Sequence, residues 1–104
     1  MKIELLYFEG CPSWETGLAN LNTALELEGI EAPVDLIKVK GDEEALQQKF
    51  LGSPSFRVNG VELWLEEREV YALSCRVYAT PEGLKGWPTI FMLRKKLQEV
   101  KEGS

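Results

Sequence analysis

The strongest constraint on the fold is a strand–helix–strand pattern at the start of the chain. An apolar run over residues 3–8 indicates a buried strand, and apolar side chains spaced by three and four over residues 12–28 predict an amphipathic helix. A second apolar run over residues 32–39 predicts another, mostly buried strand. Three such elements in succession form a βαβ unit, whose crossover is right-handed. The sequence therefore predicts an α/β fold.

A short helix and a hairpin are expected next. Asp42 is a candidate cap for a helix that ends at Gly52. The dipeptide Asn59-Gly60 stands between two alternating apolar segments, which is the strongest short signal of a β-hairpin.

Residues 65–87 carry weaker signals. Residues 70–78 have the composition of a strand, although a short helix stays open. Residues 80–83 are expected to form a turn, and Pro88 is expected to open a final helix.

Composition restricts the function. The 104 residues suit a single domain that spans residues 1–104, and the net charge of −5, without any basic stripe, argues against nucleic acid as a partner. No apolar run is long enough to span or anchor in a membrane, so we expect a cytoplasmic protein. Two cysteines without any histidine exclude a Ser–His–Asp triad and an imidazole zinc site. No cofactor and no metal-ligating set is predicted.

Cys11 is the main candidate for chemistry. It follows the first strand and precedes Pro12, which fits the first position of a helix. The cysteine is thus expected at the N-cap, where free N–H groups and the helix dipole lower the pKa of a thiol and favour a nucleophilic thiolate. The alternative is a small, inert, buried cysteine.

Two motifs carry a resemblance to a known family. With the order of elements, Gly10-Cys11-Pro12-Ser13-Trp14 and Gly52-Ser53-Pro54-Ser55 resemble the thioredoxin fold. The resemblance implies a four-stranded mixed sheet flanked by helices, here with an insertion before the last helix. It also implies that Pro54 is a cis-proline and that Ser53 offers its backbone to an extended thiol substrate. Pro12 and Trp14 are the other candidate substrate-binding residues.

The chain departs from the family at three places. Trp14 stands where the family has its second active-site cysteine, and Leu5 stands where thioredoxins have a buried acid. An insertion of more than 20 residues contains Cys75. Because the predicted hairpin returns to the end of the sheet where Cys11 lies, we expect the insertion to bring Cys75 near Cys11. Packing in the interior is the alternative role for Cys75, and Arg76 is expected to be solvated.

A narrower resemblance adds the segment Leu73-Ser74-Cys75-Arg76-Val77-Tyr78. With Cys11-Pro12 and Gly52-Ser53-Pro54, it is similar to small bacterial thioredoxin-like proteins that often carry an alkylmercury-lyase label. Organomercurial cleavage needs paired thiolates and a carboxylate that protonates the leaving carbon. The chain has the two thiols, and its nearest acids are Glu9 and Glu15.

Three function classes follow. The first is thiol–disulfide exchange or related redox chemistry with a thiol- or disulfide-bearing small molecule or protein as the partner, in which Cys11 attacks a disulfide, a sulfenate or a soft electrophile. Cys75 or an external thiol then resolves the mixed disulfide. The second is a non-enzymatic module that binds a partner segment or a soft metal ion through Cys11 and Cys75. The third is a structural domain that builds an oligomer.

Overall fold

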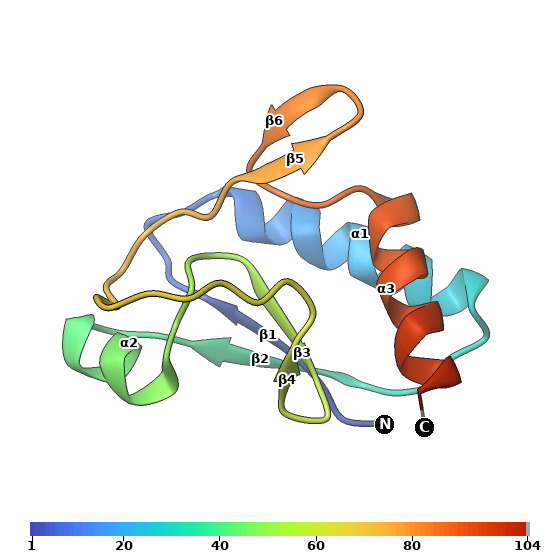
Figure 1. Cartoon of the computed structure of the whole chain (residues 1–104), viewed down its shortest axis with the longest axis horizontal. Helices are drawn as coiled ribbons and strands as arrows, with labels where there is room; N and C mark the ends of the chain where they lie inside the picture. The colour runs from blue at the N-terminus through green and yellow to red at the C-terminus, as the bar shows by residue number, and fades with distance from the viewer. Residues whose placement is uncertain (104) are drawn as a thin grey trace.

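The computed structural model describes residues 1–103 and has an α/β architecture with a four-stranded mixed sheet and three helices (Figure 1). The strands of the sheet are β1 (Ile3–Tyr7), β2 (Val34–Lys38), β3 (Ser55–Val58) and β4 (Val61–Glu62). The helices are α1 (Ser13–Leu27), α2 (Asp42–Gln48) and α3 (Ile90–Glu102). Strands β5 (Tyr78–Thr80) and β6 (Gly83–Lys85) form a separate hairpin.

The strand order of the sheet is β2-β1-β3-β4. β1 pairs in parallel with β2 and antiparallel with β3, and β3 continues antiparallel into β4. Asn59 and Gly60 turn the β3–β4 hairpin with φ angles of 53° and 83°, as a type I′ turn requires. The βαβ unit and the hairpin predicted from the sequence are thereby confirmed.

The sheet lies between two helical layers. Leu5 of β1 belongs to a cluster with Leu21 of α1 and Leu93 of α3, while the next residue, Leu6, belongs to a second cluster with Ala45 of α2. Successive side chains of a strand point to opposite faces, so α1 and α3 cover one face and α2 covers the other (Figure 1).

Several boundaries differ from the predictions. β2 is an edge strand with Leu36 46% exposed, so the expectation of a mostly buried strand is wrong. α2 ends at Gln48 rather than at Gly52, because Lys49 adopts a left-handed conformation with φ 52°. α3 begins at Ile90 because Thr89 caps it, its hydroxyl accepting a hydrogen bond from the N–H of Met92 (3.1 Å).

The insertion has an extended, irregular first part. Residues 65–77 contain no helix and no strand of the sheet, so neither form predicted for residues 70–78 is present apart from Tyr78, which begins β5. The β5–β6 hairpin reverses at the predicted turn and projects from the body of the molecule (Figure 1). Gly86 after this hairpin approaches Ser13 so closely that a Cβ would clash with the serine side chain. The base of the hairpin therefore packs on the start of α1.

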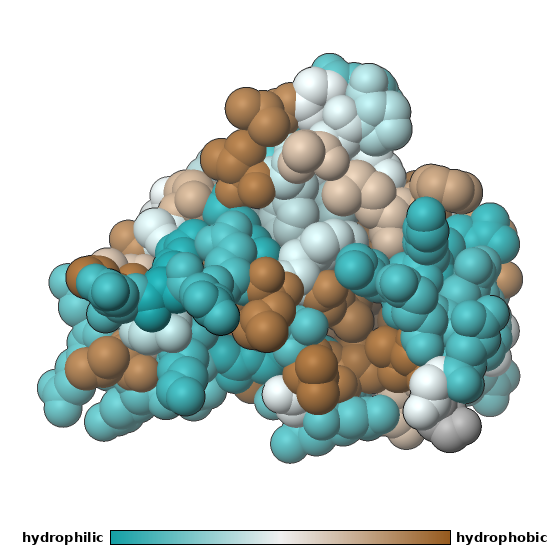
Figure 2. Space-filling model, viewed as in Figure 1, coloured by the Kyte–Doolittle hydropathy of each residue, from teal (hydrophilic) through white to brown (hydrophobic). Residues whose placement is uncertain are grey.

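The face seen in Figure 2 is mostly hydrophilic, with apolar side chains gathered beside the β5–β6 hairpin and lower on the same face. Val77 and Leu84 are among the exposed large apolar residues. Within residues 1–103, no helix has the length and apolar character needed to cross a membrane.

Candidate functional site: a buried and an exposed thiol

Cys11 lies in the turn between β1 and α1 and is 0% exposed. Its thiol donates a hydrogen bond to the carbonyl oxygen of Ser53 (3.5 Å between Sγ and O). The predicted N-cap position is wrong by one residue, because Pro12, with φ −72° and ψ −14°, itself precedes the first residue of α1. The thiol of Cys11 makes its hydrogen bond to the carbonyl oxygen of Ser53 and does not cap the helix.

Ser53 connects the sheet region to the insertion through its backbone. Its N–H donates to the carbonyl oxygen of Ser74 (2.8 Å), and its own carbonyl oxygen accepts from the N–H of Arg76 (2.9 Å). These two bonds form a parallel bridge between Ser53 and Cys75. The Ser53–Pro54 peptide bond is cis, as the resemblance to thioredoxins implied. The backbone groups of Ser53 that were expected to hold a substrate are thus occupied by the chain itself.

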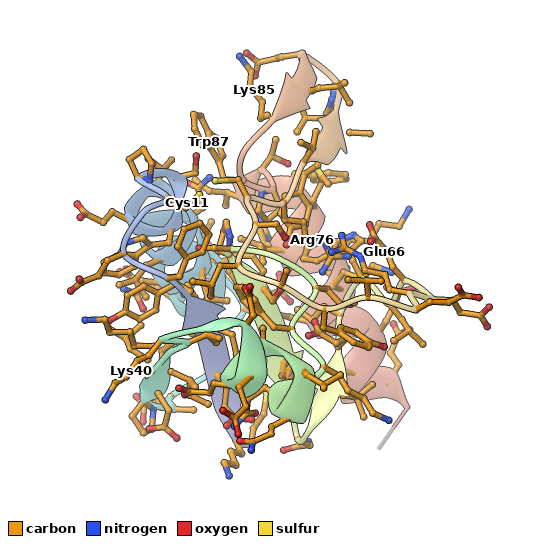
Figure 3. All side chains as sticks on the ribbon, turned by 90° about the vertical axis from the view of Figure 1, so that its left-hand side faces the viewer. Cys11, Lys40, Glu66, Arg76, Lys85 and Trp87 are labelled. Atoms are coloured by element: carbon orange, nitrogen blue, oxygen red, sulfur yellow. The ribbon has the colours of Figure 1, made fainter. Side chains whose placement is uncertain are left out.

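Cys75 is exposed and stands beside Cys11. Both cysteines are free thiols. The pKa of the Cys75 thiol is raised to about 11, mainly by a side-chain hydrogen bond with Cys11 and to a smaller extent by partial burial. The expectation that the insertion returns to Cys11 is therefore confirmed. Figure 3 shows Cys11 at the start of α1, below the projecting β5–β6 hairpin. The site consists of one buried and one exposed sulfur.

The segment Leu73–Tyr78, called the strap below, is fastened along its length. The N–H of Leu73 donates to the Asp42 carboxylate (3.1 Å), and the Tyr78 hydroxyl donates to the carbonyl oxygen of Pro54 (2.5 Å). Burial raises the pKa of Tyr78 above its ordinary range, which keeps the hydroxyl a donor. Gly52, with φ 113°, lets the strap approach, since a Cβ there would lie 3.0 Å from that of Arg76.

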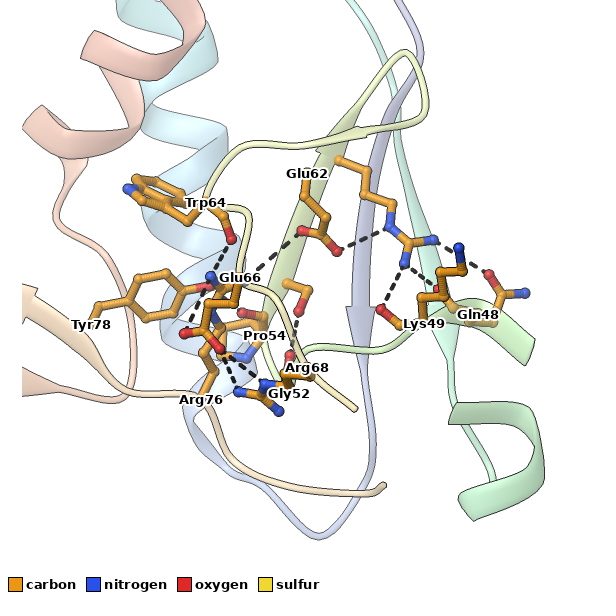
Figure 4. A network of polar contacts seen from close by, with 12 residues as sticks. Gln48, Lys49, Gly52, Pro54, Glu62, Trp64, Glu66, Arg68, Arg76 and Tyr78 are labelled. Atoms are coloured by element: carbon orange, nitrogen blue, oxygen red, sulfur yellow. Dashed lines mark hydrogen bonds and ion pairs between the residues drawn. The ribbon is translucent and has the colours of Figure 1, made fainter. Parts of the chain in front are cut away.

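Arg76 is buried, so the prediction that it is solvated is wrong. Arg76 is 4% exposed. Its guanidinium donates a hydrogen bond to the carbonyl oxygen of Trp64 and lies 5.1 Å from the centre of the Tyr78 ring. Its nitrogens are 3.9 Å from carboxylate oxygens of Glu62 and Glu66 (Figure 4). Arg76 thereby joins the strap to the segment that follows β4.

Glu62 is the buried carboxylate of this network, with a side chain 7% exposed. Burial raises its pKa, against the effect of the hydrogen bond that it accepts from Arg57 (3.0 Å). One oxygen of Glu62 and Nη1 of Arg76 are buried without a hydrogen-bond partner within the described chain. Across their separation of 3.9 Å these two atoms interact by charge without a hydrogen bond, while the other oxygen of Glu62 is paired with Arg57.

The other predicted residues lie around the pair. Pro12 is exposed, whereas Trp14 is partly buried in the main core and stacks on Tyr7 with ring centres 4.2 Å apart. Glu9 forms an ion pair with Lys38 (2.6 Å). Residues 1–103 contain no cluster of three or more potential metal-ligating acidic, cysteine or histidine side chains.

Sequence reasoning missed the anchoring roles of Arg76 and Tyr78. One signal was available: the alternation of Cys75, Arg76, Val77 and Tyr78 predicts an extended segment whose even-numbered residues share one face. In the structure that face is the buried one, and Cys75 and Val77 point outward. Gly52 beside Ser53 was a second signal, because a glycine permits the close approach of another backbone.

No family model matches this sequence, and no curated protein or solved structure is significantly similar to it. Two adjacent thiols of unequal exposure are suited to exchange of sulfur–sulfur bonds, because the exposed sulfur meets a substrate and the buried one is in place to displace it.

Proposed function

We propose that the chain is a thioredoxin-like dithiol protein that performs thiol–disulfide exchange through Cys75 and Cys11. The observation that carries the proposal is that both free thiols lie at Ser53: the buried Cys11 thiol bonds to the Ser53 carbonyl oxygen, and the exposed Cys75 pairs with the Ser53 backbone. The strand order β2-β1-β3-β4, with a cysteine after β1 that contacts Ser53, supports the thioredoxin-like part.

The two cysteines take the reverse of the roles expected from the sequence. Cys11 has no exposed surface, so a substrate cannot reach its sulfur in this conformation. Cys75 is exposed and therefore carries the mixed disulfide, while Cys11 resolves it. The raised pKa of Cys75 keeps this sulfur protonated at neutral pH, so exchange accelerates as the pH rises.

The reaction balances with a disulfide as the oxidant. The Cys75 thiolate attacks one sulfur of the substrate, forms a mixed disulfide and releases the first substrate thiolate, which takes a proton from water. The Cys11 thiol then loses its proton to water, and the resulting thiolate attacks the sulfur of Cys75, forms the Cys11–Cys75 bond and releases the second substrate thiolate. The two substrate thiolates take up two protons, which balance those that the Cys75 and Cys11 thiols lose to water. Two electrons pass from the protein to the substrate, and the reverse sequence oxidises a pair of substrate thiols.

Trapping of the mixed disulfide tests these roles. The reduced protein and its variants are treated with glutathione disulfide, and the modified peptides are identified by mass spectrometry. Cys11→Ser is expected to accumulate glutathione on Cys75, because the resolving sulfur is gone. Cys75→Ser is expected to remain unmodified in its native state. Accumulation of glutathione on Cys11 in Cys75→Ser, at the rate seen for Cys75, would reverse the assignment.

A second candidate function is binding of a soft metal ion. The observation that favours it is the adjacency of two sulfur ligands, since thiolates select ions such as Cu(I). Anaerobic titration with Cu(I) is then expected to give one bound ion per chain, and either Cys→Ser variant should lose it. Equal binding by the variants would reject this function.

A further inference from the structure

We propose that the strap, Leu73–Tyr78, occupies the backbone edge where an extended polypeptide would pair beside Cys11. The substrate disulfide is therefore a small molecule that reaches Cys75 from solvent. This inference rests on the proposed exchange function. It adds the class of substrate and the element of the chain that selects it.

Recognition of an extended polypeptide by backbone pairing requires unpaired backbone groups on the protein. A peptide that adds to a sheet edge or an extended segment uses N–H and C=O groups that the protein leaves free. Beside the sulfur of Cys11 these groups belong to Ser53, and both are bonded to the strap, to Ser74 and to Arg76. The two bonds flank Cys75, which therefore holds the place that the cysteine of a paired polypeptide would hold.

The strap is difficult for a competing polypeptide to displace. Its first residue, Leu73, is held by Asp42, its last, Tyr78, is held by Pro54, and the side chain of Arg76 is buried between them. A substrate that paired with Ser53 would have to break these contacts and expose the Arg76 guanidinium together with Glu62. Removing one member of a buried charge pair is costly, so the strap remains in place.

A small disulfide needs none of these groups. It needs one accessible sulfur on the protein, which Cys75 supplies, and a second sulfur within reach, which Cys11 supplies. Residues that flank the disulfide in a polypeptide add no backbone pairing. A longer substrate therefore gains no binding energy from backbone pairing. The geometry thus predicts that the protein acts on low-molecular-weight disulfides.

Two disulfides built from cysteine thiols of similar basicity test the substrate class. The first is the disulfide of N-acetylcysteine amide, and the second is that of a short extended peptide with a central cysteine. Each reacts with the reduced, full-length protein, and the second-order rate constants are compared. We expect the peptide disulfide to react no faster than the small one. A peptide that reacts about tenfold faster would show binding energy from backbone pairing and overturn the inference.

Amide hydrogen exchange provides an independent measurement. In the reduced protein the N–H groups of Ser53 and Arg76 are expected to exchange slowly, both with and without excess peptide. Exchange as fast as that of unpaired loop amides would show that the strap leaves Ser53 free. If neither disulfide reacts, the exchange function fails and the substrate class fails with it. Slow exchange at Ser53 would still show that the strap occupies the edge.

Discussion

Cys75 is paired with Ser53 in a parallel bridge. The carbonyl oxygen of Ser53 accepts hydrogen bonds from the strap and from the thiol of Cys11, so one residue holds both sulfurs in place. A dithiol thereby arises without two cysteines in one local motif. The second sulfur comes from the insertion. The position three residues after Cys11, where thioredoxins have their second cysteine, is filled by Trp14.

Replacement of Cys11 by alanine is expected to increase the reactivity of Cys75. The hydrogen bond with Cys11 raises the pKa of Cys75 to about 11, and its loss lets the pKa fall toward that of an ordinary thiol. At pH 8 the larger thiolate fraction outweighs the lower nucleophilicity of a less basic thiolate, for a net gain of roughly tenfold. Peptide-resolved alkylation with iodoacetamide across pH 7–10 measures this gain. A slower or unchanged reaction in Cys11→Ala would contradict the effect of Cys11 on the pKa of Cys75.

Ser53 and Ser55 form a matched pair for a stability test. The hydroxyl of Ser53 is buried without a hydrogen-bond partner among residues 1–103, whereas the hydroxyl of Ser55 donates to the carbonyl oxygen of Gly52. We expect Ser53→Ala to leave the free energy of unfolding unchanged or to raise it slightly, and Ser55→Ala to lower it by about 1 kcal/mol. Urea denaturation measures both, and the opposite order would mean that the Ser53 hydroxyl has a partner in solution.

Replacement of Arg76 by methionine is expected to destabilise the fold by about 3 kcal/mol, because it leaves Glu62 buried with Arg57 as its remaining cationic partner. The control is Arg68→Met, which removes an exposed ion pair with Glu66 and should cost less than about 0.5 kcal/mol. Chemical denaturation at neutral pH measures both. Equal effects of the two substitutions would show that Arg76 is solvated after all.

Tyr78→Phe should loosen the end of the strap while keeping the aromatic packing. The substitution removes the hydrogen bond to Pro54 and keeps a ring against Phe56 and Trp64. The loss of about 1 kcal/mol is expected to speed amide exchange at Ser53 about fivefold. Exchange in β1 is the internal control, and an equal acceleration there would indicate global destabilisation instead of loosening of the strap.

The core of the fold could be predicted because its signals are local. Helical spacing identified α1, and Asn59-Gly60 identified the β3–β4 hairpin. The direction of that hairpin then placed the insertion at the end of the sheet where Cys11 lies. Cys75 could therefore be brought near Cys11 by topology, although the two belong to segments far apart in the chain.

The strap could not be predicted in the same way, because distant contacts determine its conformation. Leu73 is held by Asp42, and Arg76 is held by Ser53 and by acids near β4. Residues 65–74 show no periodic signal of these contacts, and the alternation over residues 75–78 defines two faces without showing which one is buried. For the same reason the burial of Arg76 was missed, since an arginine in an irregular segment is ordinarily solvated.

Titration in glutathione redox buffers tests the central claim most directly. The reduced wild-type protein is equilibrated at several total glutathione concentrations, quenched with acid, and its disulfides are identified by mass spectrometry. An exchange-competent Cys11–Cys75 pair predicts an intramolecular protein disulfide. Its fraction depends on the square of the concentration of reduced glutathione divided by the concentration of glutathione disulfide. If the protein instead forms only glutathione adducts, whose fraction follows the simple ratio of the two, the dithiol account is wrong.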